Sequence, residues 1–143
     1  MANIVPDSFK TDLLGGVFDF DSSGGSTFKL ALYTDISGFS TSTTAYTTTN
    51  EVSSSGTSYT AGGNTLTNNG VAVASNVAYV DFADLTFSSV TLTAAGALIY
   101  KDTTNEAVLV LDFGGNKTAT NGDFVIQFPT ADSSNAIIRL GDA

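Results

Sequence analysis

The chain of 143 residues contains no cysteine, no histidine and no tryptophan. Without cysteine it can form no disulfide, no thiolate nucleophile and no zinc–cysteine site. Without histidine it lacks the usual general acid or base near neutral pH, which also excludes a Ser-His-Asp triad. Carboxylates are therefore the only strong candidates for catalytic groups.

Positive charge is scarce as well. Five Lys and Arg residues stand against 14 Asp and Glu, which gives a net charge of -9. Phosphate backbones and anionic membrane surfaces repel such a chain, so we expect neither nucleic acid nor membrane as a partner. No N-terminal signal pattern occurs, and no apolar run approaches the roughly 18 residues needed to span a bilayer. The sequence predicts a protein made in the cytoplasm of the cell that expresses it.

Two pairs of aspartates have a spacing that could suit Ca²⁺: Asp19 with Asp21, and Asp81 with Asp84. The spacing of an EF-hand loop is missing, and turn aspartates that accept backbone N–H groups are the more frequent use of such residues. The phosphate-binding and nucleophile motifs GxGxxG, GxxxxGK[ST] and GxSxG are also absent. We therefore predict no enzyme activity, no catalytic residue, no cofactor and no metal.

The N-terminal stretch VPDSFKTDLLGG (5–16) predicts one short helix or arm over residues 1–15. Pro6 suits the first helical position, and Gly15 suits a left-handed position that ends the helix. Phe9 and Leu13 lie four residues apart and share one face. That face either packs on the end of a sheet or docks on a neighbouring subunit, so both residues are candidates for an interface.

After the helix, apolar residues alternate with period two and are separated by Gly-Gly or Asn-Gly pairs, a pattern typical of β-strands. Ala83-Asp84 should form a bulge or tight bend, residues 103–105 a hairpin turn, and Asn121-Gly122 a second turn. Residues 107–111 should form a strand buried on both faces. The expected extended segments are 17–20, 27–34, 76–93, 96–102, 106–115, 116–129 and 135–140.

About seven to nine short strands at this spacing predict an all-β fold. We expect an antiparallel β-sandwich or jelly-roll-like domain with one short N-terminal helix. The length suits a single domain over residues 1–143.

Residues 34–70 are rich in Ser, Thr and Gly, and their central part reads STSTTAYTTTNEVSSSGTSYTAGG. Composition alone suggests a flexible linker. Tyr46, Val52 and Tyr59 nevertheless supply apolar anchors, and a long floppy excursion is unusual inside a compact domain. We therefore predict an ordered arm and take these three residues as further interface candidates. Whether the arm packs on its own domain or on the next subunit stays open at this stage.

Several strings resemble small virion structural proteins of tailed bacteriophages, of the marine and cyanobacterial type. They include FKLALYT, TAYTTTNEVSSSGTSYTAGG, DFADLTFSS, GALIY and LDFGGNKTATNGDFVIQFPTADSSNAIIRL. The most characteristic piece is TNEVS…Y at 49–59, although the stretch 53–58 is longer than in the family. The resemblance covers almost the whole chain and implies no catalytic or cofactor residue.

What the resemblance implies about function is a place in the virion. The expected role is a capsid decoration or cement protein on the outer surface of the head, a homo-oligomer such as a trimer bound to the major capsid protein. The alternative is a tail, baseplate or fibre-associated subunit that contacts tail proteins and binds glycans through exposed tyrosines. A third hypothesis for the function is a free carbohydrate-binding module or adhesin.

Overall fold

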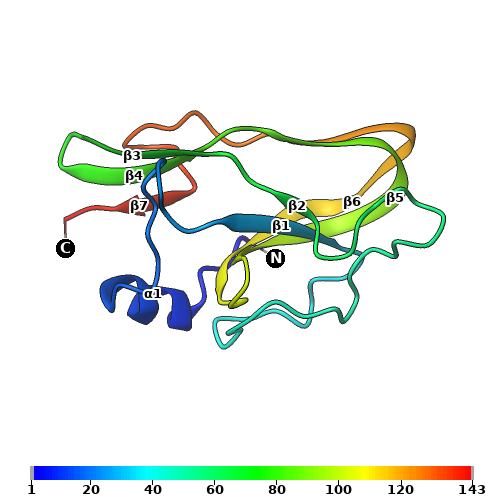
Figure 1. The fold of residues 1–143 in the computed structure, drawn as a ribbon, viewed down its shortest axis with the longest axis horizontal. Helices are drawn as coiled ribbons and strands as arrows, with labels where there is room; N and C mark the ends of the chain where they lie inside the picture. Colours follow the sequence, from blue (N-terminus) through cyan, green and yellow to red (C-terminus); the bar gives the residue numbers. More distant parts are fainter. Residues whose placement is uncertain (1, 143) are drawn as a thin grey trace.

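The computed structural model describes residues 2–142. Over this range the chain forms one helix and seven strands arranged as two antiparallel sheets (Figure 1), which confirms the predicted all-β, sandwich-like class. The elements are α1 (Asp7–Leu14), β1 (Phe28–Tyr33), β2 (Asn64–Thr65), β3 (Asn68–Ala74), β4 (Val77–Phe82), β5 (Leu85–Lys101), β6 (Ala107–Ile126) and β7 (Ile138–Leu140).

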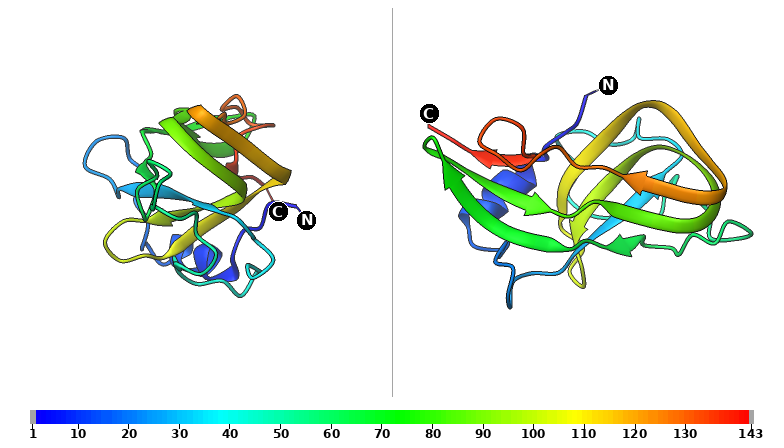
Figure 2. Two further views of the ribbon diagram at one scale, coloured as in Figure 1. Left: turned by 90° about the vertical axis from the view of Figure 1, so that its right-hand side faces the viewer. Right: turned by 90° about the horizontal axis from the view of Figure 1, so that it is seen from above.

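The first sheet has the strand order β2-β1-β5-β6, and the second has the order β3-β4-β7. Strands β5 and β6 form one long curved hairpin, visible from above in Figure 2, whose turn follows Lys101 as predicted. The expected bend at Ala83-Asp84 lies where the chain leaves β4 in one sheet and enters β5 in the other. Residues 107–111 are buried throughout, as predicted for a strand covered on both faces.

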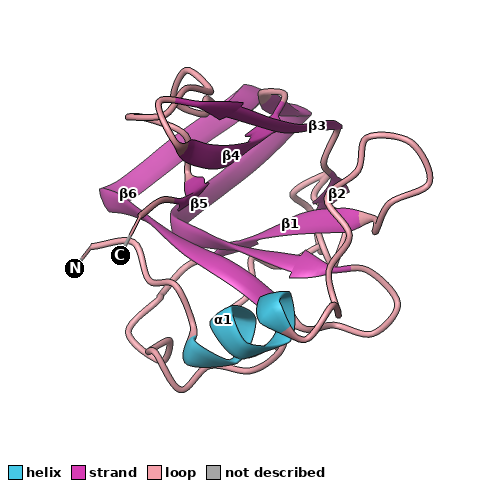
Figure 3. Cartoon of the chain, turned by 90° about the vertical axis from the view of Figure 1, so that its left-hand side faces the viewer, coloured by secondary structure: helices cyan, strands magenta, loops and turns pink. Residues whose placement is uncertain are grey.

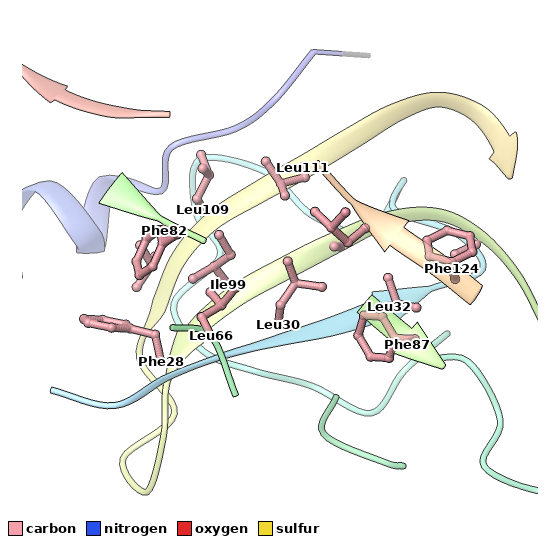
Figure 4. Close-up of a cluster of buried hydrophobic side chains, with 14 of the residues drawn as sticks. Phe28, Leu30, Leu32, Leu66, Phe82, Phe87, Ile99, Leu109, Leu111 and Phe124 are labelled. Carbon is pink, nitrogen blue, oxygen red and sulfur yellow. The ribbon is translucent and has the colours of Figure 1, made fainter. Parts of the chain in front are cut away.

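The core lies between the sheets and is dominated by aliphatic and phenylalanine side chains from β1, β5 and β6 (Figure 4). Phe20 and Phe28 stack in it, with ring centroids 4.7 Å apart and planes inclined by 5°. Phe20 belongs to the predicted extended segment 17–20, which forms no strand. The backbone of Asp19 instead bonds to Ser26, so the segment closes on itself as a loop and delivers its phenylalanines into the core.

Two predicted turns are wrong, because both lie inside the long strand β6. Gly114-Gly115 and Asn121-Gly122 were expected to separate short strands, but both pairs lie inside this 20-residue strand. Gly114, Gly115 and Asn121 have positive φ values of 72°, 136° and 46°. The pairing of β5 with β6 shifts register beside both pairs, so these residues form bulges that bend a continuous strand.

The helix α1 runs along one side of the molecule, below the strands in Figure 3. Pro6 precedes it in an extended conformation, and Asp7 is the first helical residue. Gly15 keeps right-handed angles, so the predicted left-handed cap is wrong by one residue: Gly16 adopts φ +79°. Phe9 anchors the helix in the core. Within residues 2–142, no helix has the length and apolar character to cross a membrane.

Candidate interaction surface

The Ser/Thr-rich arm packs on its own domain. Tyr33 and Ala45 pair by isolated β-bridges with Glu51 and Glu106, respectively. The N–H of Val52 donates to the carbonyl of Leu32 at 2.9 Å. In the single chain the arm therefore adds backbone bonds to β1 and to the start of β6.

The carboxylate of Glu51 is the hub of this arm. One oxygen, Oε2, accepts from the hydroxyl of Tyr46 at 2.6 Å. The other, Oε1, accepts from the hydroxyl of Tyr59 at 2.8 Å and from the N–H of Gly62 at 2.6 Å. Charge-assisted bonds of this kind are about twice as strong as neutral ones. Glu51 thus ties together three positions of the arm that lie 5, 8 and 11 residues away from it.

Four tyrosines surround this hub, and their hydroxyls are all engaged. The hydroxyl of Tyr33 donates to the carbonyl of Thr47 at 2.7 Å, and that of Tyr100 donates to the carbonyl of Gly62 at 2.7 Å. Their burial is the main reason for altered ionisation. Burial raises the pKa of Tyr100 to about 12. The pKa values of the tyrosines at 33, 46 and 59 are raised further, by burial first and by the negative charge of Glu51 in addition.

The structure brings most of the predicted interface candidates into the chain's own interior. Phe9, Val52 and Tyr59 are 4%, 5% and 3% exposed and belong to the main core. Leu13 is half-buried against that core, and Tyr46 is half-buried and stacks on Tyr100 with ring centroids 4.6 Å apart. A contact with another subunit through the first three would require the fold to open. Their assignment as interface residues is corrected to core residues.

The surface that sequence reasoning missed is an apolar groove of about 600 Å³ between α1, the first part of β6, and β7. Its apolar wall includes Leu13, Leu14, Leu109, Ile138 and Leu140. Leu14 is 83% exposed and Leu140 is 60% exposed. Exposed leucines beside an apolar hollow mark an interaction site more reliably than scattered ones. The sequence held one sign of this groove: Leu14, the second leucine of LL, does not belong to the helix face formed by Phe9 and Leu13.

Two of the chain's five cationic residues line this groove. Lys10 forms an ion pair with Asp7 at 2.8 Å, and Nη1 of Arg139 donates to the carbonyl of Ser133 at 3.4 Å. The groove therefore combines an apolar wall with Arg139 at its rim, while the charge of Lys10 is already paired with Asp7. This combination suits a partner surface that offers apolar side chains next to a carboxylate.

The aspartates considered for Ca²⁺ accept hydrogen bonds from the chain's own backbone and side-chain groups. Asp19 accepts from the N–H of Asp21 at 2.9 Å, and Asp84 accepts from the N–H of Phe128 at 2.9 Å. Asp81 accepts from the side chain of Asn69 at 3.1 Å. Among residues 2–142, no three His, Cys, Asp or Glu side chains gather in a way that could hold a metal ion.

Comparison of the chain with protein-family models, with curated proteins and with solved structures gave no match.

Proposed function

We propose that the chain is a non-enzymatic structural protein of a bacteriophage virion, a decoration protein that binds and stabilises the lattice of the major capsid protein. The observation that carries the proposal is the apolar groove with its two exposed leucines, Leu14 and Leu140. A lattice binder needs a rigid body and at least one apolar contact surface that stays open in the free chain. The resemblance of the sequence to virion proteins supports the same role.

The groove changes which part of the chain we expect to meet the lattice. The helix α1 supplies Leu13 and Leu14 to the groove and keeps the contact role expected of it. The arm of residues 34–70 does not, because its anchors Val52 and Tyr59 are buried in the same chain. We therefore place the lattice contact on the side of the molecule where α1 and β7 face each other.

The test of this role is the stability of heads that lack the protein. A decoration protein binds only the assembled lattice, so it stabilises that state by mass action. Heads without the chain should assemble but rupture at a lower temperature, and purified chain should restore their resistance. Equal heat resistance of bare and decorated heads would contradict the decoration role.

The alternative place in the virion is the tail, baseplate or fibre. A glycan-binding tail subunit would need exposed tyrosines to contact the sugar, and the positions of the tyrosines in the arm give this hypothesis little support. Tyr46 and Tyr59 donate their hydroxyls to Glu51, and Tyr59 is 3% exposed. A tail subunit without glycan binding is distinguished from a head protein by its copy number.

A further inference from the structure

Four strands lie at the edges of the two sheets, and three of them are protected against pairing with another chain. Strand β2 has two residues, and β7 has three, including Arg139. Strand β6 carries Lys117 and the bulge at Gly114-Gly115, and its first half is bridged by Ile4. Short length, cationic side chains, bulges and covering segments are the devices by which proteins block exposed edges.

Strand β3 is the exception. Its seven residues, NNGVAVA, contain no charge and no proline. Val71 is 57% exposed and Val73 is 72% exposed. Within the described residues β3 pairs with β4 alone, and the β3–β4 hairpin extends from one end of the body (Figure 2). An uncharged, apolar edge of this length is a template for a further strand.

The hairpin geometry shows which backbone groups are free. Ser75 and Asn76 have φ values of 50° and 64°, as in a two-residue type I′ turn, and the strands close with Ala74 opposite Val77. In such a hairpin the closing pair is hydrogen-bonded and the pairs then alternate. The N–H and C=O groups of Val71 and Val73 therefore point away from β4, toward the open edge.

We propose that β3 pairs antiparallel with β3 of a second copy of this chain. A two-fold axis perpendicular to the sheet, with Ala72 opposite its own counterpart, places Val71 opposite Val73 of the second copy. These two valines then meet on one face, and their outward backbone groups bond to each other.

Charge restricts how a second copy can occupy this edge. Two chains of net charge -9 repel each other, and they can pair only where no carboxylates are opposed. The edge of β3 meets this condition. Asp19 and Asp21 line a hollow together with Val71, so carboxylates of the two copies flank the shared sheet. Salt screens such repulsion, and the association should therefore strengthen as ionic strength rises.

The proposal is tested on the purified chain by sedimentation equilibrium over a range of protein and salt concentrations. We expect a reversible dimer that becomes tighter in high salt. The variant Val73→Lys should weaken dimerisation by about tenfold or more, because an edge lysine blocks strand pairing. The matched control Val125→Lys, at a valine 55% exposed on β6, should dimerise like the parent chain.

Three results would overturn the proposal: a parent chain that stays monomeric at every concentration and salt level, a dimer that weakens as salt rises, or equal effects of the two lysine variants. Thermal unfolding shows whether both variants keep the parent's stability, and Val71→Thr offers a milder change at the same edge if Val73→Lys does not fold. The proposal goes beyond the role in the virion. Its test involves no phage particle, so it can fail or succeed independently of that role.

Discussion

The hydroxyl of Tyr59 donates to the carboxylate of Glu51 at 2.8 Å and also accepts from the N–H of Leu32 at 3.0 Å. A single side chain thus connects the arm to the edge of β1 in the interior of the domain. Because the N–H of Leu32 is fully buried, the loss of this hydroxyl would leave it without a hydrogen-bond partner, so the hydroxyl should contribute measurably to the stability of the fold.

Replacing this hydroxyl gives the first prediction. Tyr59→Phe should lower the free energy of unfolding by about 2 kcal/mol, since it leaves the buried N–H of Leu32 without a partner and removes one of the two hydrogen bonds to Oε1 of Glu51. The matched control is Tyr79→Phe, whose hydroxyl makes no hydrogen bond within residues 2–142 and whose removal should change stability by less than about 0.5 kcal/mol. Denaturant unfolding measures both. Equal losses would show that the arm does not depend on the Glu51 hub.

Alkaline pH should unfold the protein through its tyrosines. Their pKa values are raised in the folded chain, to about 12 for Tyr100 and further for the tyrosines at 33, 46 and 59. The unfolded chain releases these protons near pH 10.0. The stability that the four protonated tyrosines contribute is therefore fully present below that pH and is lost as the pH rises toward 12. Tyrosinate absorbance and circular dichroism should change together. Ionisation of these residues with the fold intact would contradict their buried positions.

Close packing at Gly96 gives a third prediction. A Cβ atom there would overlap the carbonyl oxygen of Leu111 and lie 2.7 Å from Cγ2 of Ile36. Gly96→Ala should therefore lower stability by about 3 kcal/mol, the cost of forcing a packed core apart. The control Gly38→Ala has no atom within 4 Å of the added methyl group and should be close to neutral. A thermal melt separates the two, and a neutral Gly96→Ala would contradict the packing of β5 against β6.

The groove gives a fourth prediction, which concerns binding. Leu14→Asp should leave the melting temperature unchanged, since Leu14 is 83% exposed, but should weaken binding to bare heads by about tenfold or more. The control Val125→Asp changes an exposed valine that does not line the groove. Sedimentation of each variant with bare heads measures occupancy. Unchanged occupancy for Leu14→Asp would place the lattice contact elsewhere on the molecule.

The strands that the sequence predicted well are those whose alternation is local. Phe28, Leu30 and Leu32 follow one face of β1, and the hairpin between β5 and β6 follows from the polar turn at 103–105. The long course of β6 could not be predicted in this way. Asn-Gly and Gly-Gly pairs favour a hairpin turn and a bulge alike, and only the pairing with β5 decides between them.

Less of the candidate site could be predicted from the sequence. The sequence pattern predicts an ordered arm anchored by Tyr46, Val52 and Tyr59, but it does not show which residues these anchors contact. Glu51 lies within the same segment and binds both tyrosines, a relation that depends on how the arm folds back. The groove lies where α1, β6 and β7 come together, and β3 is an edge because of the strand order β3-β4-β7. Both depend on the tertiary arrangement, and the second leucine of LL is the one local hint of the groove.

The central claim, a place on the outer surface of a phage head, is tested most directly by counting this chain in purified particles. Quantitative mass spectrometry against the major capsid protein gives the number of copies, and cryo-electron microscopy of the same particles gives their location. A decoration protein follows the symmetry of the lattice and should occur in roughly hundreds of copies over the head. A count of about a dozen, with density confined to the tail, would contradict the decoration role in favour of a tail subunit, and absence from the particle would contradict a virion role altogether.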